Sequence, residues 1–153
     1  MAENSIREQI LLYTKAKLKD IEGIVKVQRK QPADMSELKE YSELEFPLIC
    51  MVGSLPDPMA HEQTRGPVLT IRDLFLSDMS ILMTTWLMDN EEPDSKVSFY
   101  LDEIWRTFYA DQEFGGLIEG LSLHPRVDVV IWEPYVGFNV EMKVQYYHGI
   151  GGI

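Results

Sequence analysis

The sequence contains a single cysteine and no long hydrophobic run. Cys50 stands alone among 153 residues, so the chain can form neither an internal disulfide nor a zinc site built from cysteines. No uninterrupted apolar stretch approaches the roughly 18 residues that a membrane-spanning helix needs, and residues 1–5 lack the features of a secretory signal. We therefore expect a protein that folds in a reducing cytoplasm around one hydrophobic core.

Cys50 itself lies in the apolar run of residues 46–52. A reactive thiolate needs an exposed, electropositive setting, which this run does not provide. The position predicts a buried core thiol rather than a nucleophile.

Positive charge is also scarce. Lysine and arginine number 14 against 25 aspartates and glutamates, and the net charge of −11 argues against broad binding to the phosphate backbones of nucleic acids. The imbalance is uneven, because residues 1–30 hold seven basic against four acidic residues and the remainder holds seven against 21. If copies of the chain pack side by side, a basic edge meeting an acidic edge would favour one register; the alternative is that both are solvated surfaces.

The motifs of several kinds of site are missing as well. The glycines at 115–116 and 149–152 lack the lysine and the strand–loop–helix setting of a phosphate-binding loop. The three histidines lack the i, i+4 spacing of a helical zinc site, and the acidic residues 89–94 lack the glycine and the distant glutamate of a calcium loop. We therefore predict a protein that is not an enzyme and has no catalytic residue, no cofactor and no bound metal.

The first half of the chain shows clear patterns of secondary structure. Ser5 precedes Glu8 by the spacing of a capping box, and apolar residues recur at helical intervals, so we predict a helix over residues 5–20. Residues 24–29 alternate as a strand, and the apolar run 46–52 is typical of a buried strand. Residues 53–66, which contain two prolines, predict an exposed loop.

Residues 31–45 are acidic and poor in apolar side chains. They predict a long loop in which Asp34 starts one helical turn. The acidic residues of this loop are Asp34, Glu37, Glu40, Glu43 and Glu45.

The middle of the chain predicts two strands and a second helix. Residues 67–76 and 79–88 are rich in β-forming residues, and Ser77-Asp78 between them predicts a hairpin. A polar turn over residues 89–94 leads to the helix. Its apolar face is formed by Leu101, Ile104, Trp105 and Phe108.

The last third begins with Gly115 and Gly116, which predict a left-handed turn and a short helical turn that continues to Leu121. Residues 126–133 predict a strand, residues 134–137 a turn, and residues 138–146 a strictly alternating strand. Trp132 and Tyr135 flank that turn, where each is either an exposed interface anchor or a core residue. Residues 149–153 predict a flexible tail.

These elements predict a single α+β domain over residues 1–148. Their order is α-β-β-β-β-α-β-β, and strands joined by short turns favour a mostly antiparallel sheet. We expect the two main helices to pack on one face of that sheet.

The layout contains six features in a particular order. These are a helix beginning Ser5-Ile6-Arg7, a strand, a Phe46-Pro47 entry to an apolar strand, a hairpin, a helix before Asp111-x-x-x-Gly115-Gly116-Leu117, and an alternating strand ending Tyr146-Tyr147. In this order they resemble the tail terminator, or tail completion, proteins of long-tailed bacteriophages. The resemblance is one of layout, covers nearly the whole chain, and rests on short motifs.

The resemblance implies a structural virion protein without catalysis, assembled in the host cytoplasm. It implies a homohexameric ring on the head-proximal end of the tail tube, which stops tube polymerisation and offers a docking surface to the head connector. Its partners would be other copies of the chain, the tail tube protein and the connector, with genomic DNA passing through the ring without specific binding.

Three of our site predictions follow from this reading. The basic residues Lys26, Arg29 and Lys30 are candidates for an interface between copies, as are Trp132 and Tyr135. The acidic residues of 31–45 are candidates for the lumen, because like charge lets DNA slide without binding. The alternatives are another head–tail neck or completion protein, and a small cytoplasmic enzyme or ligand-binding domain with a pocket between the helices and the sheet.

Overall fold

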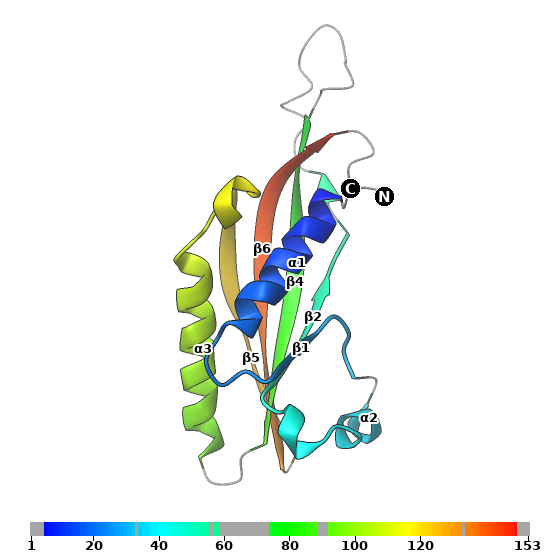
Figure 1. Ribbon diagram of the computed structural model, residues 1–153, viewed down its shortest axis with the longest axis vertical. Helices are drawn as coiled ribbons and strands as arrows, with labels where there is room; N and C mark the ends of the chain where they lie inside the picture. Colours follow the sequence, from blue (N-terminus) through cyan, green and yellow to red (C-terminus); the bar gives the residue numbers. More distant parts are fainter. Residues whose placement is uncertain are drawn as a thin grey trace, which may run out of the picture.

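The structure is a computed structural model that describes residues 5–32, 34–55, 57–58, 74–88, 92–132 and 134–149 (Figure 1). The side chains of residues 35, 43, 57–58, 74–75, 125–128, 132 and 149 are not described. The elements form one mixed sheet with helices packed on it, so the predicted α+β class is confirmed.

The sheet has six strands in the order β1-β2-β4-β6-β5, with β3 paired to β4 beside the end of β2. The strands are β1 (Lys26–Gln28), β2 (Leu48–Gly53), β3 (Asp57–Pro58), β4 (Leu74–Met88), β5 (Gly120–Trp132) and β6 (Tyr135–Gly149). β1 and β2 are parallel, and every other pairing between the described strands is antiparallel. The mostly antiparallel sheet of our prediction is therefore confirmed.

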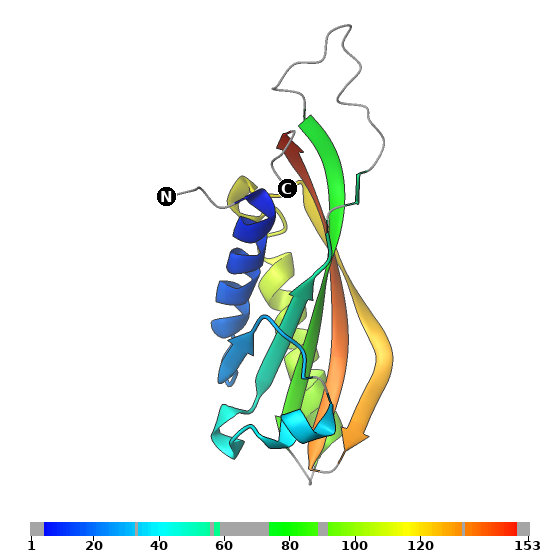
Figure 2. The same ribbon diagram turned by 90° about the vertical axis from the view of Figure 1, so that its right-hand side faces the viewer.

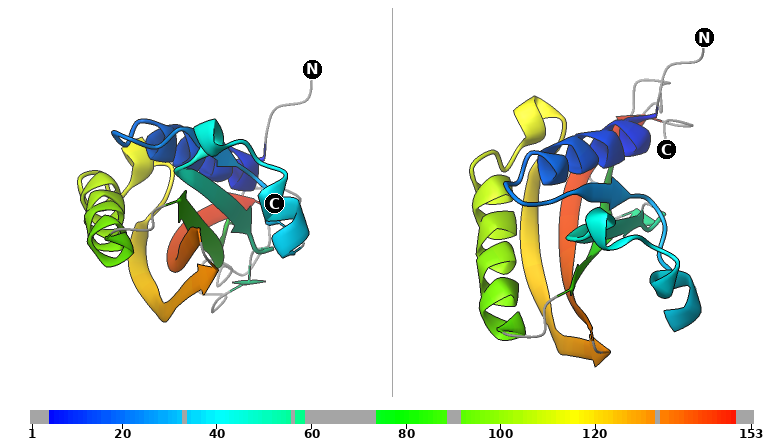
Figure 3. Two further views of the ribbon diagram at one scale, coloured as in Figure 1. Left: turned by 90° about the horizontal axis from the view of Figure 1, so that it is seen from below. Right: turned by 60° about the horizontal axis from the view of Figure 1, so that its bottom comes forward.

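Two long helices, α1 (Ile6–Lys19) and α3 (Pro93–Tyr109), lie on the same face of the sheet (Figures 1 and 3). The shorter elements are α2 (Met35–Lys39), η1 (Glu43–Glu45) and η3 (Phe114–Gly116). α2 packs on the opposite face of the sheet. Its Leu38 clusters with Leu48, Cys50 and Trp86, whereas the intervening residues Ile49 and Met51 belong to the core beneath the long helices. The sheet is therefore covered by helix along its length on one face and only in part on the other.

The helix starts follow from side-chain capping. The Ser5 Oγ accepts a hydrogen bond from the Glu8 amide at 3.1 Å, as the capping-box spacing indicates. The Asp34 carboxylate accepts one from the Glu37 amide at 3.0 Å. α3 instead begins with Pro93, whose fixed φ suits the first helical turn.

The main core fills the space between the two long helices and the sheet. Its buried side chains alternate along β4 and β6, where Met79, Ile81 and Met83 face Val140 and Met142. A second, smaller core lies on the opposite face and comprises Leu38, Phe46, Leu48, Cys50, Trp86 and Tyr135. Cys50 is fully buried there, and burial raises the pKa of its thiol to about 11, so the prediction of a core thiol is confirmed.

Two strand predictions were wrong. Ser77 and Asp78 do not form a hairpin turn; they lie inside the continuous strand β4, where Ser77 is buried and its Oγ lies 2.7 Å from the His148 Nε2 on β6. The strand predicted at 126–133 starts earlier, at Gly120, so no helical turn continues to Leu121. A neighbouring strand satisfies the polar side chain of Ser77, which a local pattern cannot show.

Three boundaries also differ from our expectations. The turn predicted at 134–137 is shorter, because Tyr135 to Gly137 already belong to β6. β6 also includes Gly149, which pairs with Leu74, so the predicted tail starts too early; residues 150–153 lie outside the described residues. The loop predicted over 31–45 contains α2 and η1 rather than one turn. The loop predicted at 53–66 is interrupted by strand, because Gly53 ends β2 and Asp57–Pro58 form β3. Residues 56 and 59–66 of that loop, and residues 67–73 of the predicted strand at 67–76, lie outside the described residues.

Candidate assembly surfaces

The three basic residues predicted at an interface all bind acidic residues of their own chain. The Lys26 Nζ lies 3.4 Å from the Glu45 Oε1, and the Lys30 Nζ lies 3.3 Å from the Glu37 Oε1. The Arg29 guanidinium binds the Glu8 carboxylate at 2.5 Å, and this hydrogen bond lowers the pKa of Glu8. The sequence suggested the basic residues for an interface and the acidic residues of 31–45 for a lumen, but the structure pairs two of the basic residues with two of the acidic ones.

The same contacts neutralise part of the negative charge that was predicted to face a lumen. Glu37 and Glu45 pair with lysines, and Asp34 caps α2. Glu40 is exposed, and the side chain of Glu43 is not described. Of the negative charge predicted for residues 31–45, only a part is therefore exposed and not paired with a lysine.

The two aromatic residues beside the β5–β6 turn differ in what the structure describes. Tyr135 is buried in the second core, with its ring centroid 5.6 Å from that of Phe46. The Tyr135 side chain therefore takes the core role of its two alternatives. The side chain of Trp132 lies outside the described ones.

Gly115 and Gly116 both adopt positive φ, of 66° and 98°. The Asp111 carboxylate fixes this turn, because it accepts a hydrogen bond from the Gly115 amide at 3.2 Å and one from the Tyr13 hydroxyl of α1 at 2.5 Å. Both bonds favour the charged carboxylate, and the pKa of Asp111 is lowered, first by the bond from Tyr13. The turn therefore ties α1 to the connection between α3 and β5.

The face of the sheet opposite the long helices is polar where the second core ends. The Gln31 amide donates to the Thr84 Oγ1 at 3.0 Å, which donates to the Asn139 Oδ1 at 2.6 Å. Farther along, the Ser80 hydroxyl donates to the Glu141 carboxylate at 3.2 Å. The alternation of polar residues along 139–145 signals such a face, but the residues that join it from β4 could not be identified without the register.

Two shallow hollows lie on this polar face. One, of about 280 Å³, is lined by Asp78, Gly120, Leu121, Ser122, Lys143 and Gln145. The other, of about 320 Å³, is lined by Gln31, Val52, Gly53, Ser54, Ser80, Leu82 and Glu141. Both lie away from the space between the long helices and the sheet, which the main core fills.

The outer edge of β5 is the surface that sequence reasoning missed. Val129 and Ile131 belong to the helix-facing side of the sheet, yet the two residues are 43% and 58% exposed. β5 bows outward along its middle (Figure 2), and its register with β6 shifts between Pro125 and Val129. The other end of β5 is closed by α3, because the Leu123 amide donates to the Tyr109 hydroxyl at 3.3 Å.

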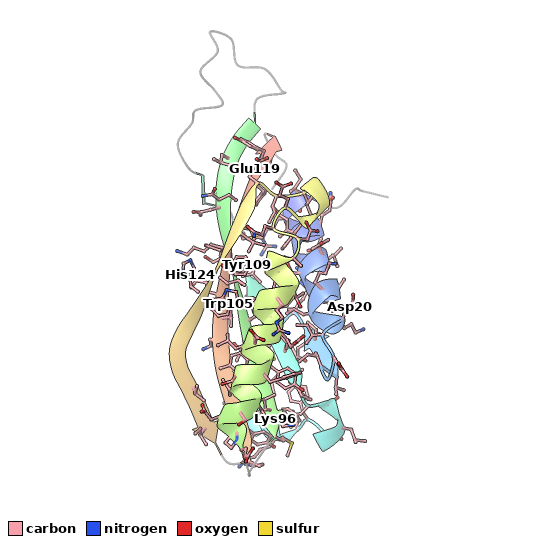
Figure 4. All side chains as sticks on the ribbon, turned by 90° about the vertical axis from the view of Figure 1, so that its left-hand side faces the viewer. Asp20, Lys96, Trp105, Tyr109, Glu119 and His124 are labelled. Atoms are coloured by element: carbon pink, nitrogen blue, oxygen red, sulfur yellow. The ribbon has the colours of Figure 1, made fainter. Side chains whose placement is uncertain are left out.

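Figure 4 shows Trp105 and Tyr109 on the side of α3 that is turned toward β5. Their rings stack with centroids 6.5 Å apart. The edge of β5 is therefore divided into a part protected by aromatic residues, near Leu123, and a bare apolar part, near Ile131.

Within the described ranges, no group of three or more His, Cys, Asp or Glu side chains is placed to hold a metal ion. Across the same part of the chain, no helix has the length and apolar character needed to span a membrane. Comparison of the sequence with protein-family models gives no match, and no curated protein is significantly similar to it.

Proposed function

We propose that this chain is a structural assembly protein of the tail terminator type. It forms a homohexameric ring on the head-proximal end of a phage tail tube, stops tube polymerisation and offers a docking surface to the head connector. Genomic DNA passes through the ring without specific binding, which suits a chain with a net charge of −11.

The observation that carries this proposal is the bare apolar edge of β5, with Val129 and Ile131 exposed. Soluble monomeric proteins protect the edges of their sheets, because an open edge templates pairing with another chain. An edge that is protected at one end by Tyr109 and left bare at the other is suited to a specific contact. The layout that resembles tail terminators supplies the identity of the assembly; of its features, the hairpin at Ser77 and Asp78 is replaced by the continuous strand β4.

A different head–tail neck or completion protein would use the same features, and its position in the virion would distinguish the two. The enzyme or ligand-binding alternative called for a pocket between the helices and the sheet. Apolar side chains occupy that space, which favours the assembly reading.

The first test is the mass of the purified protein in solution by light scattering, over a range of concentrations, followed by negative-stain imaging with and without tail tubes. We expect a species of six times the 17.7 kDa chain, or a monomer that forms rings on tube ends. A monomer at every concentration that does not bind tubes would contradict the proposed function.

A further inference from the structure

Among the strands that the structure describes, the sheet has a second open edge, at β1, and the direction of its backbone groups can be assigned. Within β1, which begins at Lys26, the Lys26 amide donates to the Pro47 carbonyl at 3.4 Å, in register with the pairing of Lys26 and Leu48. The Val25 amide, just before the strand, donates to the same carbonyl at 3.0 Å. Alternate residues of a strand direct their N–H and C=O groups to opposite sides. The backbone groups of Val27 therefore point away from β2, toward the outside of the sheet.

The same reasoning applies to the edge at β5. The Leu123 amide points away from β6, because it donates to the Tyr109 hydroxyl. Leu123 pairs with Met142, and Val129 pairs with Phe138. Phe138 and Met142 are four residues apart on β6, so their backbone groups point to the same side of that strand. The N–H and C=O of Val129 therefore also point outward.

These two residues lie at opposite ends of one row across the sheet. The row runs Val27, Ile49, Thr85, Phe138, Val129 through four successive pairings. The two free edges are therefore at the same level along the strand direction.

The two edges also match in direction and in side chains. β1 and β5 run in opposite directions, so a copy rotated about an axis along the strands would place its β1 antiparallel to β5. Val25, two residues before Val27, is 51% exposed, which resembles the exposure of Val129 and Ile131 on the facing edge. Cross-strand pairs of β-branched residues stabilise such a contact.

We propose that β1 of one copy pairs antiparallel with the bare part of β5 of a second copy. Val27 lies opposite Val129 in this pairing, and the side chain of Val25 lies beside that of Ile131, while the Val25 amide keeps its bond to the Pro47 carbonyl. The inference rests on the proposed function, for which it names the contact between neighbouring subunits. Since the two edges are different surfaces, the contact is heterologous, which is the kind that builds rings.

A second copy is the occupant that the geometry favours. The bare part of β5 is short, from Val129 to Trp132, and β1 has three residues, so the two lengths correspond. Their alignment in one row means that successive copies are not displaced along the strands, as a closed ring requires.

The test is a cross-linking experiment with the full chain carrying both Val25→Cys and Ile131→Cys. Both side chains are more than half exposed, so the fold should tolerate the changes. Residues opposite each other in antiparallel strands have Cα atoms about 4.5–5.5 Å apart, which a disulfide can span. The native Cys50 is buried and should not react.

Under oxidising conditions and at high protein concentration, we expect the double variant to form a covalent ladder on a non-reducing gel. Each single variant should run as an uncross-linked monomer on the same denaturing gel, because the two ends of a heterologous contact differ. The matched control pairs Ile131→Cys with Leu12→Cys, which is 42% exposed on α1 and away from the edge. This control should form no ladder above the background of random collisions.

The outcomes separate the contact from the function. Rings in solution without a ladder would overturn the edge pairing and leave the terminator function standing. A ladder with open filaments, or with no binding to tail tubes, would support the edge pairing and overturn the function. A dimer from either single variant, or no ladder at any concentration, would overturn the edge pairing.

Discussion

At the scale of single residues, two glycines are required for different reasons. Gly116 has a φ of 98°, in a region that side chains with a Cβ rarely adopt, although nothing lies within 4 Å of the place a Cβ would take. Gly137 has an ordinary strand conformation, but a Cβ there would lie 2.6 Å from the indole ring of Trp86. The first glycine is needed for its backbone and the second for the space above it.

Replacement of Gly116 by valine should destabilise the protein by about 1–3 kcal/mol, because a β-branched residue is strained at positive φ. Chemical denaturation would measure the loss. Gly120→Ala is the matched control, since Gly120 lacks the positive φ, has open space around it and should lose much less. Equal losses in both variants would show that strain at positive φ is not the cause.

Residue patterns predicted local features and missed long-range ones. The caps at Ser5 and Asp34 follow from three-residue spacings, so the sequence was sufficient to place them. The contact between Gly137 and Trp86 joins two strands, and the bond between Tyr13 and Asp111 spans 98 positions. No local signal encodes either contact.

At the scale of elements, the bond between Tyr13 and Asp111 joins α1 to the connection that leads from α3 to β5. Tyr13 also stacks on Phe114, with ring centroids 4.4 Å apart. Burial and the bond to Asp111 raise the pKa of Tyr13 to about 12, so its hydroxyl stays protonated and donates across the neutral range. These contacts position the start of β5.

This bond predicts a specific loss of stability in acid. The folded-state pKa of Asp111 lies below the ordinary aspartate value of 3.8, so its contribution is present above that value and disappears as the pH falls through the lowered pKa. Asp111→Asn should therefore show a smaller drop in the free energy of unfolding between pH of about 6 and 3 than the wild type. Urea denaturation at each pH would measure the difference.

Tyr13→Phe provides the matched variant, because it removes the donor and leaves the carboxylate. It should reduce the acid-induced loss in the same direction. If both variants lose stability in parallel with the wild type, the bond does not stabilise the charged carboxylate.

Element boundaries were predictable where the pattern was strong and failed where polar residues lie inside strands. The alternation of residues 138–146 placed the centre of β6 correctly. The hairpin predicted at Ser77 and Asp78 failed because turn-forming residues also occur in strands when a partner satisfies them. His124 and Pro125 concealed the first half of β5, since proline is tolerated on an edge strand.

At the scale of the whole molecule, the lysines and arginine of the predicted basic edge are largely used inside the chain. Lys26, Arg29 and Lys30 each pair with an acidic residue, and pairs exposed to solvent in this way contribute little to stability. Copies that each carry a net charge of −11 repel one another in the absence of salt.

Association of copies should therefore strengthen as salt is added. The screening length falls from about 30 Å at 0.01 M to about 8 Å at 0.15 M ionic strength, which weakens the repulsion more than it weakens apolar contacts at an edge. Sedimentation or light scattering at fixed protein concentration would follow the oligomer fraction. An oligomer that dissociates over the same range would instead indicate an interface built from pairs of opposite charge.

The polarity of the whole surface was predictable from composition, whereas the candidate site was not. Val129 and Ile131 lie in a run that reads as an ordinary strand, and their exposure follows from the bow of β5 and the position of α3. Both depend on the assembled sheet. Only the topology makes β5 the last strand and leaves its outer side without a strand partner among the described residues.

The closure of one end of β5 by Tyr109 has a consequence for cooperativity. The Tyr109 hydroxyl accepts the hydrogen bond of the Leu123 amide, so this amide is not available to an added strand. A strand that pairs at Val129 therefore cannot extend along the whole edge of β5, and each contact between copies would stay small. A small contact gives low affinity between two free copies, yet a copy held by neighbours on both sides gains from two contacts at once. In the proposed assembly, such subunits would remain dispersed until a template gathers them, and the end of a finished tube would then set the moment of assembly.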